Sequence, residues 1–236
     1  MALETNRVSI MHDKTIVALD MPSLKDNLNL IDQLEKHMWY KTGLNFVTQN
    51  GFDAVRNLAL YKNVFLDLKL YDISNTVQDA VKNIADMGVK FLTVMGDPHI
   101  VEAASKVKGD VKILAVTILT SLNRNDLNMN LIKDGDLKHI VEQRADIAFR
   151  FGADGVICSP EEIKLLRKTH LRTDFSSVNY DDKLIVTPGI RSKQDDTGDQ
   201  KRIATRSQAI KDGADYVVIG RPIYKANNPL EALRSL

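Results

Sequence analysis

Several apolar stretches of the chain are followed by charged residues, and we start from the cluster Asp67-Leu68-Lys69-Leu70-Tyr71-Asp72 at the end of one of them. Residues two apart on a β-strand project from the same face at a spacing of about 6.6 Å, so Asp67 and Lys69 are expected to point the same way. Opposite charges on a buried strand require each other as partners and usually mark a functional site rather than a solvated salt bridge. Such a pair can transfer a proton and stabilise developing charge.

Two more charged residues end apolar stretches earlier in the chain. Asp20 follows Thr15-Ile16-Val17-Ala18-Leu19, and Lys41 lies within Trp39-Tyr40-Lys41-Thr42-Gly43. Either residue alone is compatible with a structural ion pair. Together with the Asp67 segment, they predict an array of alternating charge that converges on one point.

Glycine and arginine near the end of the chain predict an anion site. Gly220-Arg221 follows the last apolar stretch of the chain. Thr187-Pro188-Gly189-Ile190-Arg191 begins with the final residue of the preceding apolar stretch. Glycine lets backbone amides approach an anion, and arginine can bind a phosphate with two parallel hydrogen bonds. The polar segment 192–200 has no apolar anchor. We interpret it as a lid over bound ligand, with an ordinary surface loop as the alternative.

Eight short apolar stretches, rich in β-branched residues, alternate with helix-like spacing, which is typical of parallel βα units. In 236 residues, of which 44% are hydrophobic, they predict one domain spanning residues 1–236. The fold class is α/β, and a (β/α)8 TIM barrel is favoured over a doubly wound open sheet. The predicted strands are Thr15–Asp20, Trp39–Gly43, Val64–Lys69, Phe91–Val94, Val111–Thr117, Gly155–Cys158, Leu184–Thr187 and Tyr216–Ile219.

The intervening helices are expected to be amphipathic. Helix starts are predicted at the capping residues Ser23, Ser159 and Asn228, of which the last two precede a proline and the second precedes a capping-box glutamate at Glu162. Apolar residues recur at helical spacing in two groups, Leu24, Leu28 and Ile31, and Val77, Val81 and Ile84.

Composition excludes several classes of function. The formal net charge is +1 without a long run of one sign, so neither nucleic acid nor a membrane surface is an expected partner. The single cysteine, Cys158, lies in an apolar run and predicts a buried thiol in a cytoplasmic protein. The histidines fit no metal spacing, and there is no dinucleotide-binding or Walker motif, so no metal or cofactor is expected.

The pattern Asp67-x-Lys69-x-x-Asp72-Ile73-x-x-Thr76 resembles the signature of the orotidine 5′-monophosphate decarboxylase family. The resemblance extends over nearly the whole chain and includes, in order, Val17-Ala18-Leu19-Asp20, Lys41-x-Gly43, Thr117-Ile118-Leu119-Thr120-Ser121, Thr187-Pro188-Gly189-Ile190-Arg191, Asp199-Gln200 and Gly220-Arg221. Two segments depart from the family pattern. Met95-Gly96-Asp97-Pro98-His99 stands where His-x-x-Gly-Gly is usual, and Ser74 replaces a proline.

The resemblance implies a carboxy-lyase that converts orotidine 5′-monophosphate to uridine 5′-monophosphate and CO2, the last step of de novo UMP synthesis, without metal or cofactor. It also implies a homodimer with shared active sites. Lys69 would donate the proton that replaces CO2, within a catalytic tetrad of Lys41, Asp67, Lys69 and the partner subunit's Asp72. Substrate binding would fall to Asp20, Lys41, Ile73, Thr76, Thr120, Pro188, Arg191, Gln200, Gly220 and Arg221.

Two other readings remain open at this point. Related phosphosugar barrels, such as 3-keto-gulonate-6-phosphate decarboxylases and hexulose-phosphate synthases, share the Asp-x-Lys-x-x-Asp core but use Mg²⁺. They generally carry a glutamate where this chain has Lys41, and a lysine there repels a metal. The second reading is a catalytically silent barrel that binds a phosphorylated metabolite or a protein, which is expected to have lost a member of the tetrad.

Overall fold

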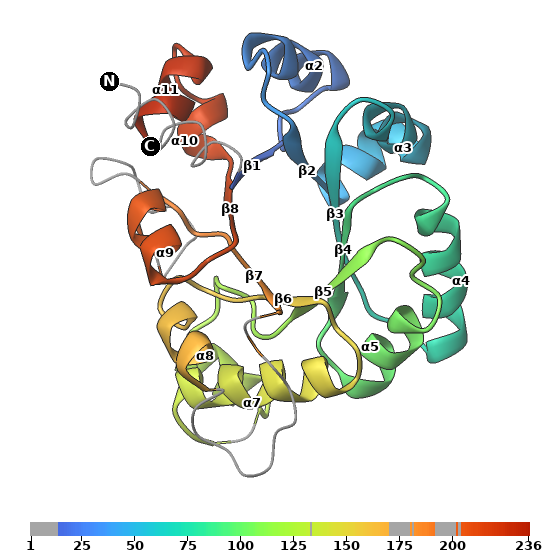
Figure 1. Ribbon diagram of the computed structural model, residues 1–236, viewed down its shortest axis with the longest axis vertical. Coiled ribbons are helices and arrows are strands. Elements are labelled where there is room, and N and C mark those ends of the chain that lie inside the picture. The colour runs from blue at the N-terminus through green and yellow to red at the C-terminus, as the bar shows by residue number, and fades with distance from the viewer. Residues whose placement is uncertain (1–13, 133, 170–179, 181, 192–201, 203) are drawn as a thin grey trace.

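The computed structural model describes residues 14–132, 134–169, 180, 182–191, 202 and 204–236. In these residues parallel strands close into a barrel in chain order, with helices around the outside (Figure 1). Strand β1 pairs with β8 as well as β2, so the sheet has no open edge; this confirms the (β/α)8 prediction and excludes the doubly wound sheet. The strands are β1 (Thr15–Ala18), β2 (Trp39–Gly43), β3 (Asn63–Leu70), β4 (Phe91–Met95), β5 (Lys112–Val116), β6 (Gly155–Ile157), β7 (Leu184–Thr187) and β8 (Tyr216–Ile219).

Strand boundaries differ from the predicted ones by at most one residue, except at the end of β1, which is two residues shorter. β1 ends at Ala18, although Leu19 still donates its backbone N–H to the carbonyl of Lys41 at 2.9 Å. Asp20 therefore lies just beyond the strand. β3 is longer than predicted and continues to Leu70, through an irregular section described below.

The helices cover the outer face of the barrel between successive strands (Figure 1). Their bounds are α2 (Leu24–Gln33), α3 (Leu44–Ala59), α4 (Ser74–Ala85), α5 (Pro98–Ser105), α6 (Arg124–Met129), α7 (Leu137–Arg150), α8 (Ile163–Thr169), α9 (Arg206–Asp212), α10 (Arg221–Tyr224) and α11 (Pro229–Ser235). No helix among the described residues is long and apolar enough to cross a membrane.

Two helix predictions are corrected by the structure. Leu28 in α2 is exposed, because Asn27 turns inward instead and donates to the carbonyls of Ser23 and Met21. Helix α8 begins at Ile163 and not directly after Ser159. The Glu162 carboxylate accepts the N–H of Ser159 at 2.7 Å and closes a turn ahead of the helix.

The other helix signals are confirmed. The side chains of Ser23 and Asn228 accept backbone N–H groups at the starts of α2 and α11. The apolar face of α4 is buried through Val77, Val81 and Ile84. Cys158 is fully buried, as predicted, in the apolar layer between strands and helices.

An aromatic layer fills the N-terminal end of the barrel. Trp39, Phe91 and Tyr216 are the first residues of β2, β4 and β8, and their ring centroids lie 4.8 to 5.2 Å apart. Phe65 packs against Phe91 on the side of this layer that faces the C-terminal ends of the strands. These rings occupy the bottom of the barrel, so its interior opens toward the C-terminal ends of the strands, where barrel enzymes have their active sites.

Candidate active site

A cavity of about 580 Å³ lies at the C-terminal ends of the strands, a size that suits a small molecule. Most of the site residues predicted from the sequence line it, namely Asp20, Lys41, Asp67, Lys69, Thr120, Pro188, Arg191, Gly220 and Arg221. Side chains that are separated by up to about 200 positions in the sequence are thus brought to one place by the closure of the barrel.

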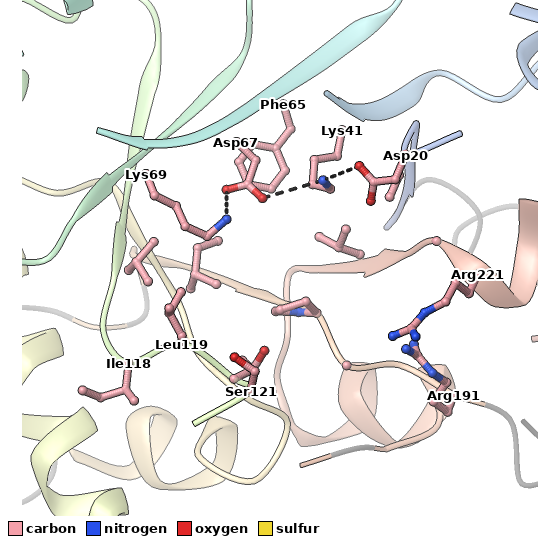
Figure 2. Close-up of a pocket in the computed structure, with 18 of the residues that line it drawn as sticks. Asp20, Lys41, Phe65, Asp67, Lys69, Ile118, Leu119, Ser121, Arg191 and Arg221 are labelled. Atoms are coloured by element: carbon pink, nitrogen blue, oxygen red, sulfur yellow. Dashed lines mark hydrogen bonds and ion pairs between the residues drawn. The ribbon is translucent and has the colours of Figure 1, made fainter. Parts of the chain in front are cut away.

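Four charged side chains form a continuous row on one wall of the cavity, as Figure 2 shows. Lys41 Nζ lies 3.1 Å from Asp20 Oδ1 and 3.7 Å from Asp67 Oδ2. Lys69 Nζ lies 2.8 Å from Asp67 Oδ1. The side chains of Lys41 and Asp67 are only 13% and 15% exposed, so the central pair is not a solvated surface salt bridge.

The charge of Asp67 is fixed by its two lysine neighbours. Burial by itself raises the pKa of this carboxyl group, but the charges of Lys41 and Lys69, together with hydrogen bonds from Lys69 and Thr93, outweigh burial and lower its pKa. Asp67 is therefore an anion at neutral pH. Lys69 is more accessible, with 36% of its side chain exposed, and its ammonium group points along the cavity wall (Figure 2).

The backbone at Lys69 is strained. Its φ is +51°, in the left-handed region that residues other than glycine rarely adopt, at a cost of about 1–3 kcal/mol. The pairing of β3 with β4 is also irregular here, because Leu66 lies opposite Leu92 whereas Leu70 lies opposite Val94. Strain and bulges of this kind occur preferentially at active sites, where they aim a side chain.

The structure explains why the third position of the Lys41-x-Gly43 motif is glycine. A Cβ atom at Gly43 would lie 3.0 Å from Lys41 Nζ and 3.8 Å from an oxygen of Asp20. Any larger residue would displace the ammonium group from the row of charges. Glycine at this position therefore lets β2 turn into α3 without disturbing Lys41.

Two arginines form the other end of the cavity. Figure 2 shows the guanidinium groups of Arg191 and Arg221 close together, across the cavity from Lys69. Arg221 begins α10 directly after Gly220. Arg191 is buried, and its backbone N–H donates to the carbonyl of Ala204. Two guanidinium groups that face one space favour an anion with several acceptor oxygens, as a phosphate has.

The remaining predicted site residues are not brought to the cavity of this chain. Asp72, Ile73 and Thr76 are exposed at the start of α4, and the Asp72 carboxylate accepts the N–H of Ile73 at 2.7 Å. Gln200 lies outside the described residues. Among the described residues, no group of three or more histidine, cysteine or acidic side chains is placed to hold a metal ion.

The two segments that depart from the family pattern have structural roles. A Cβ at Gly96 would lie 2.7 Å from the carbonyl oxygen of Val116, so the chain can pass β5 only with glycine there. Asp97 and Pro98 start α5, and Asp97 lies 3.5 Å from Arg144 of α7. Ser74 is the first residue of α4.

Sequence reasoning missed two groups of residues. The first is the apolar wall of the cavity, which includes Phe65, Val116, Ile157 and Val218 on the inner faces of their strands. The two-residue alternation from Asp67 back to Phe65 could have revealed it. The second is the pair of buried polar residues that support the site, Thr93 and Glu162. Glu162 forms a buried ion pair with Arg202, which also donates to the carbonyl of Leu119 in the cavity wall.

A closed barrel with a charged cavity at the C-terminal ends of its strands defines the chain as a (β/α)8-barrel enzyme. Residues 13–236 match the family described as orotidine 5′-phosphate decarboxylase / HUMPS. The chain belongs to this family.

Named relatives agree with the family match. Orotidine 5′-phosphate decarboxylase of Ruegeria pomeroyi is 46% identical over 229 residues, which cover 95% of this chain and 92% of the relative. The protein of the same name from Jannaschia sp. is 47% identical, with 93% and 95% covered. The crystal structure of orotidine 5′-phosphate decarboxylase from Lactobacillus acidophilus is similar with a TM-score of 0.79 at 31% identity, and covers 94% of this chain and 96% of that one.

Proposed function

We propose that the protein is a carboxy-lyase that converts orotidine 5′-monophosphate to uridine 5′-monophosphate and CO2, the last step of de novo UMP synthesis. The observation that carries the proposal is the position of Lys69, held by Asp67 on one wall of a cavity whose opposite end has two arginines. A nucleotide with a phosphate at one end and a reacting carbon at the other fits this separation of charge. The named relatives support the same reaction.

Lys69 supplies the proton in the proposed reaction. The bond between C6 of the pyrimidine and the carboxylate breaks, and its electron pair stays on C6. A proton passes from Lys69 Nζ to C6 as CO2 leaves, and the amine then regains a proton from solvent. Enzymes in general lower such barriers by about 8–23 kcal/mol, and here the ammonium group would face the developing negative charge.

The neighbours of Lys69 keep it in place. Asp67 would lie near the departing carboxylate and disfavour the charged ground state, and Lys69 would make the larger contribution by stabilising the charge that develops on C6. Lys41 links Asp67 to Asp20, which would bind ribose hydroxyl groups. Thr120 would contact the pyrimidine edge and Pro188 would pack near the base, because both line the cavity. Since these groups are already arranged, little reorganisation is needed during the reaction.

The phosphate would be bound by Arg221, Arg191, backbone amides near Gly220 and, from outside the described residues, Gln200. Binding energy from this remote group can be used to close the site and to stabilise the transition state.

The direct test is the decay of ultraviolet absorbance of orotidine 5′-monophosphate with purified protein in EDTA. We expect complete conversion to uridine 5′-monophosphate at an unchanged rate when EDTA is added, because the positive charge at C6 comes from Lys69. The ammonium group of Lys41 lies 3.7 Å from Asp67, where it opposes the binding of a divalent cation. Absence of conversion, together with magnesium-dependent turnover of a phosphosugar, would contradict the proposal and support the related phosphosugar barrels.

We further propose that the active form is a homodimer in which Asp72 of the partner subunit completes each site, with Ile73 and Thr76 at the shared boundary. In one chain Ile73 and Tyr71 are 71% and 66% exposed, and they follow closely in sequence on Lys69, which lines the cavity. Large apolar side chains exposed close together are typical of a protein interface.

Mixing two inactive variants tests the shared site. We expect Lys69→Ala and Asp72→Ala each to be nearly inactive alone, and a mixture in equal amounts to recover about a quarter of the wild-type activity, because half of the dimers are mixed and each has one intact site. Asp79→Ala, on the exposed face of α4, is the matched control and should remain fully active alone. If the mixture stays inactive after subunit exchange, each site is built from one chain.

A further inference from the structure

Thr93 lies in the middle of β4 and is fully buried beside the catalytic wall of the cavity. Its hydroxyl group makes two hydrogen bonds to β3. It donates to Asp67 Oδ1 at 2.8 Å and accepts the backbone N–H of Lys69 at 2.9 Å. One side chain thus contacts both members of the proposed proton-transfer pair.

The irregular pairing of β3 and β4 explains why this contact is needed. Between the paired positions Leu66–Leu92 and Leu70–Val94, the segment Asp67–Lys69 of β3 faces only Thr93 of β4. The extra residues displace the N–H of Lys69 from the regular ladder, and a buried N–H requires an acceptor. The Thr93 hydroxyl provides it, at the residue whose φ is +51°.

The direction of the hydrogen bonds also orients Asp67. Because the Thr93 oxygen accepts the N–H of Lys69, its single proton is available for Asp67 Oδ1. The same Oδ1 accepts from Lys69 Nζ, which leaves Oδ2 to face Lys41. The carboxylate is therefore held in one rotation, with each oxygen assigned to a different lysine.

We propose that Thr93 is a positioning residue for the decarboxylation, which holds the strained backbone of Lys69 and the carboxylate of Asp67 so that the ammonium group reaches the reacting carbon. The expected effect of Thr93 on turnover rests on the proposed function. Its effect on the backbone of Lys69 does not. Thr93 does not line the cavity, so it acts through Asp67 and Lys69 and not through substrate.

Thr93→Val removes the hydroxyl group at nearly constant volume. We expect kcat for orotidine 5′-monophosphate to fall about 10- to 100-fold, as for loss of a hydrogen bond to a charged catalytic group. KM and the Kd of uridine 5′-monophosphate should change by less than about threefold, since phosphate and ribose contacts are untouched. Thr93→Ser, which keeps the hydroxyl group, should restore kcat to within about threefold of wild type.

Amide hydrogen exchange gives a readout that does not depend on the reaction. The Lys69 amide should exchange at least about tenfold faster in Thr93→Val than in wild type or Thr93→Ser, because it loses its acceptor. The matched control is Thr42→Val, since Thr42 is equally buried on β2 and its hydroxyl has no hydrogen-bond partner among the described residues. This control should change neither kcat nor the exchange of Lys69.

Three outcomes would overturn the role of Thr93. These are a kcat for Thr93→Val within twofold of wild type, an equal loss in Thr93→Ser, or unchanged exchange of the Lys69 amide. A wild-type protein that does not convert orotidine 5′-monophosphate contradicts the proposed function instead, and the exchange measurement still decides whether Thr93 holds Lys69.

Discussion

Lys69→Ala is expected to lower kcat for orotidine 5′-monophosphate by at least about 10⁴-fold. The change removes the proton donor, which contributes about 10²- to 10⁴-fold in enzymes generally, and the only ammonium group within hydrogen-bond distance of Asp67 Oδ1 in the described residues. The Kd of uridine 5′-monophosphate should change little, because the arginines at the far end of the cavity remain. Turnover is measured by ultraviolet absorbance and binding by calorimetry.

Two further variants give this prediction its controls. Lys69→Arg keeps the positive charge, but a guanidinium group does not release its proton, so it should remain strongly impaired if proton transfer matters. Lys82→Ala removes an exposed lysine that also pairs with an aspartate, and should be fully active. Near-normal turnover of Lys69→Ala with unchanged binding would show that the proposed mechanism is wrong.

Arg221→Ala is expected to lower kcat/KM for orotidine 5′-monophosphate by about 100- to 1,000-fold, mainly through KM. Removing one partner of a desolvated, hydrogen-bonded charge pair costs about 2–5 kcal/mol. Arg191 remains beside the phosphate position and limits the loss. Steady-state kinetics measure the effect, at an ionic strength that is held constant because salt screens the attraction of the phosphate to the arginines.

Orotidine without a phosphate separates this role from general damage. For orotidine, kcat/KM should be the same in wild type and Arg221→Ala, because the lost guanidinium group has no phosphate to bind. Arg150→Ala, which removes an exposed arginine paired with Asp146, is the matched control and should match wild type with both substrates. A similar loss with the two substrates would assign Arg221 to the structure of the site and not to phosphate binding.

The fold and most of the cavity could be predicted from the sequence because they depend on local or periodic patterns of apolar residues. Each strand is a short apolar stretch, and barrel closure places the strand ends together whatever the details of the helices. Asp20, Lys41 and Asp67 could therefore be assigned to one site from their positions at strand ends alone. The apolar face of α4 followed from helical spacing in the same way.

Features that depend on pairing between distant segments could not be predicted. The extra residues in β3 become visible only against the register of β4, so neither the strain at Lys69 nor the role of Thr93 has a signal in the sequence. The local sequence predicts a capping role for Glu162. Its buried ion pair could not be predicted, because the partner, Arg202, lies 40 positions away in the chain. Leu28 was assigned to the wrong face for a local reason, since Asn27 turns inward and donates to the carbonyls of Met21 and Ser23.

The aromatic layer at the bottom of the barrel has a practical consequence. Trp39 is the only tryptophan in the chain, and it stacks on Phe91 and packs against Tyr216 at the end of the barrel opposite the cavity. Its fluorescence emission is therefore an intrinsic reporter of barrel closure that is remote from the charged wall and the arginines. Denaturation of every variant named above can be followed by this one signal, which separates loss of structure from loss of chemistry without a probe or a ligand.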